Sequence, residues 1–146
     1  MTVQGLCREH LPAVAGIERA VFSAPWSEKT LELLLTEDAT GAVCLSDGEA
    51  VAYGGMLWAP GEGQITNIAV MEGFRGKGFG NAILTFLIDA ARARRCELVS
   101  LEVRESNRAA ISLYEKHGFA IAGKRKRFYK TPVEDALVMI LELNYE

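Results

Sequence analysis

The sequence predicts an α+β fold in which a mixed, mostly antiparallel β-sheet is flanked by helices. In the middle of the chain, apolar β-like segments alternate with segments of helical spacing, which is typical of a strand–helix–strand crossover with parallel strands. On both sides of this unit, extended segments follow one another across turn residues, which indicates antiparallel hairpins. We therefore expect about seven strands and about four helices.

Turn residues and helix caps set the boundaries of the expected elements. Pro12 is tolerated in the first turn of a helix, and Ser27 is a suitable N-cap. Asp47-Gly48 favours a tight hairpin, the segment 60–63 predicts another turn, and Gly118 is a suitable left-handed helix end. The expected strands cover residues 3–7, 42–46, 50–58, 64–70, 98–103, 120–127 and 136–143, and the expected helices cover 11–22, 27–35, a segment ending near 95, and 107–117.

Length and charge limit the possible functions. With 146 residues, of which 49% are hydrophobic, residues 1–146 suit a single domain with its own core. The net charge of −3 does not predict a nucleic-acid-binding surface. No secretory leader and no apolar run long enough to cross a bilayer is recognisable, so we expect a cytoplasmic protein without a membrane partner.

The cysteines and histidines do not form a metal-binding pattern. Cys7, Cys44 and Cys96 are scattered and include no CxxC pair, so neither a disulfide framework nor a zinc site is predicted. His10 and His117 lack metal-ligand spacing. His117 precedes a helix-ending glycine, where a cation would suit the helix dipole, and we interpret it as structural.

The most informative segment is a glycine-rich loop, Arg-Gly-Lys-Gly-Phe-Gly over residues 75–80, which follows the strand ending Asn-Ile-Ala-Val. Alternate glycines leave backbone N–H groups accessible, and the helix N-terminus that follows favours an anion. This predicts a phosphate-binding loop. Phe79 stands where a P-loop requires Lys, and no third glycine completes a dinucleotide fingerprint. The alternative is a glycine-rich surface turn.

Several single residues have both a functional and a structural interpretation. Glu102 lies near the carboxyl end of a strand, where ligands bind in such sheets, but it could be a solvated carboxylate. Tyr114 has a phenol with an ordinary pKa of about 10 and could donate a proton, or it could be a core residue. Asn107 could simply cap a helix, and Trp26 could be a core anchor.

Taken together, the motifs resemble those of the GCN5-related N-acetyltransferase (GNAT) superfamily. Asn-Ile-Ala-Val, Arg-Gly-Lys-Gly-Phe-Gly, Leu-Glu-Val-Arg-Glu-Ser-Asn and Leu-Tyr-Glu-Lys-His-Gly-Phe follow one another from Asn67 to Phe119. With the segments 22–29, 127–129 and 134–136, the resemblance covers nearly the whole chain and is greatest to the RimI type. That type acetylates the N-terminal alanine of ribosomal small-subunit protein eighteen. The segment 128–130, Phe-Tyr-Lys, departs from the paired tyrosines and proline common in the family.

The resemblance implies acetyl-CoA as cosubstrate, a protein N-terminus as acceptor and direct transfer without a metal. Glu102 would be the general base and Tyr114 the general acid, while Trp26 and Tyr129 would contact the peptide. Residues expected to contact coenzyme A are Ile68, Ala69, Val70, Arg75, Gly76, Lys77, Gly78, Phe79, Gly80, Asn81 and Asn107.

Two alternatives stay open at this point. A small-molecule amine acetyltransferase of the same superfamily would share the cosubstrate site and differ in the segment 25–29 and in the last hairpin. A non-catalytic acyl-CoA-binding regulatory module would tolerate loss of Glu102 and Tyr114.

Overall fold

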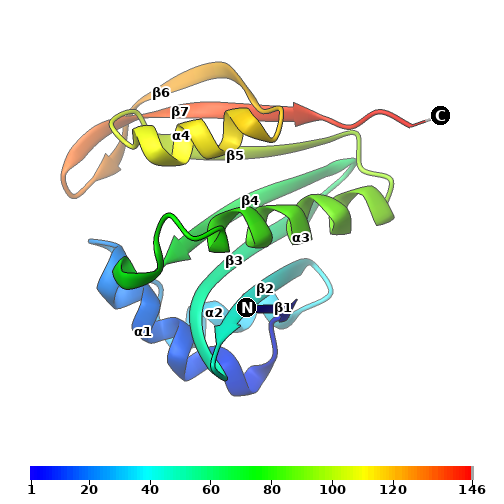
Figure 1. Cartoon of the computed structure of the whole chain (residues 1–146). Helices are drawn as coiled ribbons and strands as arrows, with labels where there is room; N and C mark the ends of the chain where they lie inside the picture. The colour runs from blue at the N-terminus through cyan, green and yellow to red at the C-terminus, as the bar shows by residue number, and fades with distance from the viewer. Residues whose placement is uncertain (146) are drawn as a thin grey trace.

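A seven-stranded mixed sheet with strand order β1-β2-β3-β4-β5-β7-β6 forms the centre of the molecule (Figure 1). It is seen in a computed structural model that describes residues 1–145. All neighbouring strands are antiparallel except β4 and β5, which are parallel, so the predicted fold class and crossover are confirmed. The elements are β1 (Thr2–Gly5), α1 (Leu11–Val21), α2 (Glu28–Leu31), β2 (Ala39–Ser46), β3 (Glu49–Ala59), β4 (Glu62–Val70), α3 (Phe79–Ala93), β5 (Leu98–Arg104), α4 (Arg108–Lys116), β6 (Ala120–Lys130) and β7 (Val133–Glu142).

The second helix begins where its cap predicts but changes type. The backbone N–H of Thr30 donates to Ser27 Oγ at 3.1 Å, so Ser27 caps α2. The predicted helix runs to Leu35, but only its first turn is α-helical, and Glu32–Leu35 form a 3-10 helix. Such tightening is common in short helices, because few i to i+4 hydrogen bonds are available.

Residues with positive φ mark the sharp turns. Asp47 and Gly48 have φ of 51° and 80°, the pair of left-handed conformations that a two-residue hairpin requires. Gly118, with φ of 97°, ends α4 as predicted. The turn predicted over residues 60–63 is shorter, because Gly61 alone has the left-handed conformation and β4 already begins at Glu62.

Helices cover both faces of the sheet and create two core clusters. α1, α2 and the 3-10 helix after α2 pack on one face, where Leu11, Val14 and Leu31 are buried. α3 and α4 pack on the other face, around Ile83 and Leu87 (Figure 1). None of the described helices is long and apolar enough to cross a membrane.

The two parallel strands separate towards their carboxyl ends. β4 and β5 pair only over residues 62–64 and 98–100. Directly afterwards the register between β3 and β4 shifts, because Thr66 is an extra residue in β4 that lies between paired positions. A bulge of this kind bends a strand, and Figure 1 shows β4 and β5 diverging beyond it. The edge of β4 that faces β5 is therefore left without a strand partner next to the glycine-rich loop.

Candidate active site

The glycine-rich loop joins the end of β4 to α3 and leaves an open, polar surface. Gly76 and Gly78 have φ of 75° and 89°, a conformation that side-chain-bearing residues rarely adopt. Gly78 is the N-cap of α3, and its carbonyl oxygen accepts from Ala82 N–H at 3.0 Å. A Cβ built on either glycine would meet no atom within 4 Å. The start of α3 thus offers backbone donors and the positive end of a helix dipole to an anion.

Charged and polar side chains flank this loop. Arg75 Nε donates to the Val70 carbonyl oxygen at 3.1 Å, and the exposed Lys77 lies beside it. Asn81 Oδ1 lies 2.6 Å from His117 Nε2, so the start of α3 is tied to the end of α4. This bond supports the structural interpretation of His117. Burial lowers the pKa of His117, and a neutral ring with Nε2–H donating to Asn81 Oδ1 fits the contact.

Replacing Gly78 by valine is expected to weaken coenzyme A binding about tenfold or more. A β-branched residue at this φ costs about 1–2 kcal/mol or more, so the binding-competent loop conformation becomes a minor state. Titration calorimetry with coenzyme A measures the effect. Gly73→Val is the matched control, because Gly73 is equally open but needs no positive φ. Equal affinities of the two folded variants would contradict the role of this loop.

Glu102 and Tyr114 come from β5 and the helix that follows it. Leu101 and Val103 point into the core, so Glu102 lies on the opposite face and is half-buried. Tyr114 is 8% exposed, and its ring packs 5.8 Å from that of Phe119, measured between centroids. Burial raises the pKa of Tyr114 to about 12, so its phenol is protonated throughout the neutral range. Among the described residues, no hydrogen bond involves its hydroxyl group.

Tyr129 links these two residues electrostatically. Burial is the largest cause that raises its pKa; Arg104 lowers the pKa in part, and the charges of Glu102 and Glu134 raise it further. Tyr129 in turn contributes to the raised pKa of Tyr114. Arg104, two residues after Glu102 on β5, stacks on the Tyr129 ring, so the structure brings the predicted base and one predicted peptide-binding residue to the same end of β5. The effect of Tyr129 on the pKa of Tyr114 agrees with the predicted acid lying near them.

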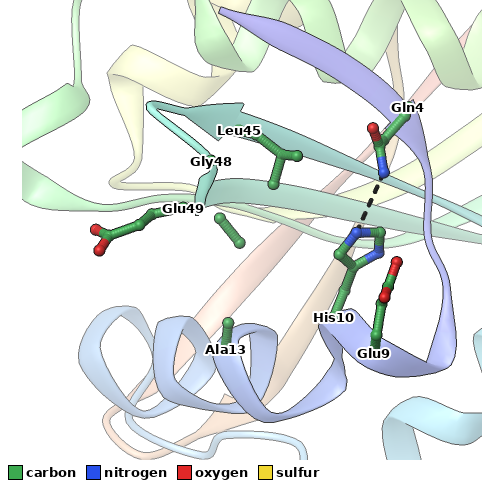
Figure 2. Close-up of a pocket in the computed structure, with 8 residues that line it drawn as sticks. Gln4, Glu9, His10, Ala13, Leu45, Gly48 and Glu49 are labelled. Atoms are coloured by element: carbon green, nitrogen blue, oxygen red, sulfur yellow. Dashed lines mark hydrogen bonds between the residues drawn. The ribbon is translucent and has the colours of Figure 1, made fainter.

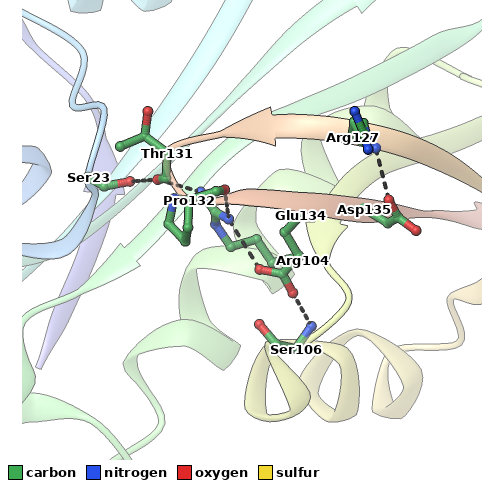
Figure 3. Close-up of polar contacts among 8 residues, drawn as sticks. All are labelled: Ser23, Arg104, Ser106, Arg127, Thr131, Pro132, Glu134 and Asp135. Atoms are coloured by element: carbon green, nitrogen blue, oxygen red, sulfur yellow. Dashed lines mark hydrogen bonds and ion pairs between the residues drawn. The ribbon is translucent and has the colours of Figure 1, made fainter.

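Arg104 holds the turn between β6 and β7 in place (Figure 3). Its guanidinium donates to the carbonyl oxygens of Thr131 and Pro132, each at 3.0 Å, and pairs with Glu134 at 3.1 Å. It also stacks 4.3 Å from the centroid of the Tyr129 ring. A planar fork of donors suits this combination of partners, which a lysine could not reproduce.

The same turn reaches the segment between α1 and α2. Ser23 Oγ donates to the carbonyl oxygen of Thr131, as Figure 3 shows. On the other side, Ser106 N–H donates to Glu134 at 2.7 Å. The Ser106 side chain is the largest cause that lowers the pKa of Glu134 below its usual value; this backbone bond comes next, and Arg104 contributes as well. The hairpin turn is thus tied to two loops around the site.

Replacing Arg104 by lysine is expected to raise the KM for an acceptor peptide about tenfold and to leave the acetyl-CoA Kd unchanged. The lost charged hydrogen bonds release the hairpin turn and the Tyr129 ring. Steady-state kinetics with each substrate varied would measure this. Arg125→Lys serves as the control, since the Arg125 guanidinium lies 5.7 Å from the centroid of the exposed Phe128 ring and has no hydrogen bond to the hairpin turn among the described residues. An unchanged peptide KM for Arg104→Lys would show that the hairpin does not contact the peptide.

Sequence reasoning missed a buried carboxylate on α1. Glu18 is 0% exposed. Its Oε1 accepts from Trp26 N–H at 2.7 Å, and its Oε2 accepts from Asn67 Nδ2 at 3.0 Å and from the Tyr53 hydroxyl group. A signal was available, because Glu18 continues the apolar stripe of α1 at helical spacing. Arg104 was missed as well, and nothing in its local sequence marks it.

The structural interpretations of Asn107 and Trp26 also have support. Asn107 Oδ1 accepts from Ala110 N–H at 3.2 Å and caps α4, while its amide nitrogen has no hydrogen-bond partner within residues 1–145. Trp26 is half-buried and packs against the α1 core cluster.

Two surface hollows are present, one away from the groups described so far and one beside the hairpin turn. The larger, of about 650 Å³, lies between β1, the start of α1 and the β2–β3 hairpin (Figure 2). Both ring nitrogens of His10 already have protein partners, since Cys7 N–H donates to Nδ1 at 2.9 Å and Gln4 Nε2 lies 3.2 Å from Nε2. The bond from Cys7 N–H also explains why β1 ends before residue 7, because this N–H is not available to a neighbouring strand. The smaller, of about 500 Å³, lies beside the hairpin turn and is lined by Glu105, Ser106, Arg108, Glu134 and Asp135. Neither contains a residue that the sequence predicts for the site.

The fold and the glycine-rich loop suit a transferase with a phosphate-bearing cosubstrate, and comparisons with known proteins identify the family. The acetyltransferase (GNAT) family matches residues 11–119. The ribosomal protein bS18-alanine N-acetyltransferase of Escherichia coli is 36% identical over 145 residues, which cover 98% of each chain. A Bacillus subtilis protein described as a putative enzyme of the same kind is 33% identical over 144 residues, covering 97% of this chain and 95% of that protein. The crystal structure of the Escherichia coli enzyme superposes with a TM-score of 0.91 at 35% identity, covering 99% of this chain and 95% of that one.

The chain belongs to the GNAT acetyltransferase family. Enzymes of this family transfer the acetyl group of acetyl-CoA, so the chain is an acetyl-CoA-dependent N-acetyltransferase. The observed loop suits that cosubstrate, because the two open glycines at the start of α3 leave room for a pyrophosphate.

Proposed function

We propose that residues 1–146 act as one catalytic domain that acetylates the α-amine of a protein N-terminus, with the N-terminal alanine of ribosomal protein bS18 as substrate. The observation that carries this proposal is the near-complete coverage of two relatives with that name at 33% and 36% identity. Glu102, Tyr114 and the hairpin turn in one neighbourhood support it. Ribosomal proteins are made in the cytoplasm, so we infer a cytoplasmic location.

Cosubstrate binding is assigned to the loop and to the free edge of β4. The backbone of residues 76–81 would surround the pyrophosphate, with Arg75 at the entrance, and Asn107 would donate its free amide N–H. Ile68, Ala69 and Val70 pair with β3 on one edge but lie where β4 has no partner in β5. Their backbone groups on that second edge, apart from the Val70 carbonyl oxygen if Arg75 keeps its bond to it, would pair with the pantetheine arm. One of these N–H groups could also donate to the thioester carbonyl oxygen, as in an oxyanion hole.

The proposed chemistry needs one base and one acid. Acetyl-CoA supplies an activated acetyl group as a thioester. Glu102 would accept a proton from the peptide ammonium, directly or through water; an α-amine has a pKa near 8, so modest assistance is sufficient. Tyr114 would give its proton to the departing sulfur. Its pKa of about 12 keeps the phenol in the donating form. Trp26 and Tyr129 would contact the peptide.

The proposal is tested by measuring acetyl-CoA turnover with three acceptors. One is a peptide with a free N-terminal alanine, the second is the same peptide blocked at its N-terminus but carrying a lysine, and the third is a free polyamine. We expect only the first to be a good substrate. A preference for the polyamine would support the small-molecule alternative, and binding of coenzyme A without turnover of any acceptor would support a regulatory module.

A further inference from the structure

We infer that Glu18 is a positioning residue that fixes the peptide-binding segment between α1 and α2 against the bulge of β4. The inference rests on the proposed function, since it assigns the acceptor peptide to this segment. In the part of the chain that the structure describes, the hydrogen-bond partners of the Glu18 side chain are Trp26, Tyr53 and Asn67 and include no residue of the glycine-rich loop, so its effect should fall on the acceptor and not on the cosubstrate.

Burial and partner geometry make the carboxylate costly to disturb. Glu18 has no exposed surface, and a carboxylate in such a place requires hydrogen-bond donors. Its three partners come from three different elements: Trp26 from the segment after α1, Tyr53 from β3 and Asn67 from β4. Burial and the neighbouring Glu18 hold the pKa of Tyr53 far above its usual value, so the phenol remains a donor. The Glu18 side chain therefore joins β3 and β4 to the segment between α1 and α2.

The segment after α1 is held at two points. At its end, the Trp26 backbone is bound to the buried carboxylate, and near its start, Ser23 is bound to the β6–β7 turn. Ala24 and Pro25 between them are exposed. Without the Glu18 contact, the segment would keep the surface bond from Ser23 to Thr131 and the packing of the half-buried Trp26 ring, but its backbone near Trp26 would lose a buried anchor. We therefore expect the position of the Trp26 ring to become more variable.

The contact with Asn67 connects Glu18 to the part of β4 next to residues 68–70, which are proposed to bind the cosubstrate. Asn67 lies directly after the bulge residue Thr66, where β4 leaves β5. Asn67 Oδ1 and Thr66 Oγ1 are buried and have no hydrogen-bond partner among the described residues. Glu18 is therefore the one recorded hydrogen-bond partner that orients the Asn67 amide. The Glu18 carboxylate thus binds both the segment between α1 and α2 and β4, the strand that carries the proposed oxyanion donor, and holds the two at a fixed distance.

The first measurement is steady-state kinetics of Glu18→Gln. Glutamine keeps the size but places an N–H₂ group among three donors, so at least one of them loses its acceptor. We expect the peptide KM to rise about tenfold and the acetyl-CoA Kd to change by less than about twofold. Tyr53→Phe removes one donor and keeps the carboxylate; it should shift the peptide KM in the same direction by less, and it replaces Glu18→Gln if that variant does not fold.

The second measurement does not depend on activity. Hydrogen exchange of the Trp26 amide should accelerate in the variant, and in a Trp58→Phe background, where Trp26 is the single tryptophan, acrylamide should quench its fluorescence more strongly. Val14→Ala is the control. Val14 is buried one turn earlier on α1, so its truncation destabilises the same core without touching the network.

Each outcome decides one question. Unchanged Trp26 exchange and unchanged peptide KM in a folded Glu18 variant would overturn the inference. The inference would also be overturned if Val14→Ala changed the Trp26 exchange rate and the peptide KM as much as Glu18→Gln does, at an equal loss of unfolding temperature. If the wild type acetylates no peptide, the proposed function fails, while the exchange data still decide whether Glu18 holds the segment.

Discussion

Replacing Tyr114 by phenylalanine is expected to lower kcat by about 10²–10⁴-fold, the usual contribution of general acid–base catalysis, with little change in acetyl-CoA affinity. The substitution removes only the proton donor, because the phenyl ring can keep its packing against Phe119. Single-turnover kinetics together with calorimetric binding of acetyl-CoA separate the two effects. Because the pKa of Tyr114 is raised to about 12, ionisation of this residue should cause no loss of rate below about pH 11.

The matched control for this experiment is Tyr145→Phe. The Tyr145 hydroxyl group donates to the Cys96 carbonyl oxygen at 2.7 Å in the C-terminal part of the chain, so its loss tests the general cost of removing a phenol. We expect Tyr145→Phe to turn over at close to the wild-type rate. A wild-type kcat for Tyr114→Phe would return Tyr114 to a purely structural role.

Replacing Glu102 by glutamine is expected to lower turnover at neutral pH by a similar factor, about 10²–10⁴-fold. Glutamine preserves the shape of the side chain on β5 but cannot accept the proton of the amine. The deficit should shrink as the pH rises through about 8, where an α-amine loses its proton unaided, and should shrink much less for a lysine ε-amine with a pKa near 10.4. pH–rate profiles with the free and the blocked, lysine-containing peptide measure this difference.

Glu105→Gln is the control for Glu102→Gln. Glu105 is an exposed carboxylate three residues further on, and it pairs with Lys124 at 2.9 Å. Exposed pairs contribute little, so this variant should retain wild-type rates at every pH. If Glu102→Gln behaves in the same way, Glu102 is not the base.

Much of the fold is predictable because its signals are local. Asp47-Gly48 and Gly118 need left-handed conformations, and the structure has them there. The parallel pairing of β4 and β5 could be predicted from the order strand, helix, strand alone, without knowledge of the contacts between them. The loop was predicted to bind phosphate because its glycines leave backbone N–H groups accessible, and the positive φ of Gly76 and Gly78 agrees with a conformation that needs glycine there.

The less predictable parts of the site depend on contacts between distant segments. Glu18 meets Tyr53 and Asn67 across 35 and 49 residues of sequence, so its apolar surroundings hint at burial but not at its partners. Arg104 meets the hairpin turn across 27 and 28 residues and has no local peculiarity. The shift in register at Thr66 depends on how β4 packs against β3, which no periodicity of β4 alone encodes.

The short pairing between β4 and β5 also has a consequence for how the molecule resists unfolding. Residues 62–64 and 98–100 carry the main-chain pairing between an antiparallel unit of β1 to β4 and another of β5, β7 and β6. Proteins open first where cooperative units share few hydrogen bonds, so this junction is the natural boundary between two such units. A molecule bound between the diverging strands contacts both units and opposes their separation. Its concentration then sets the free energy of that opening by mass action, with about 2.7 kcal/mol gained at a hundred times its Kd.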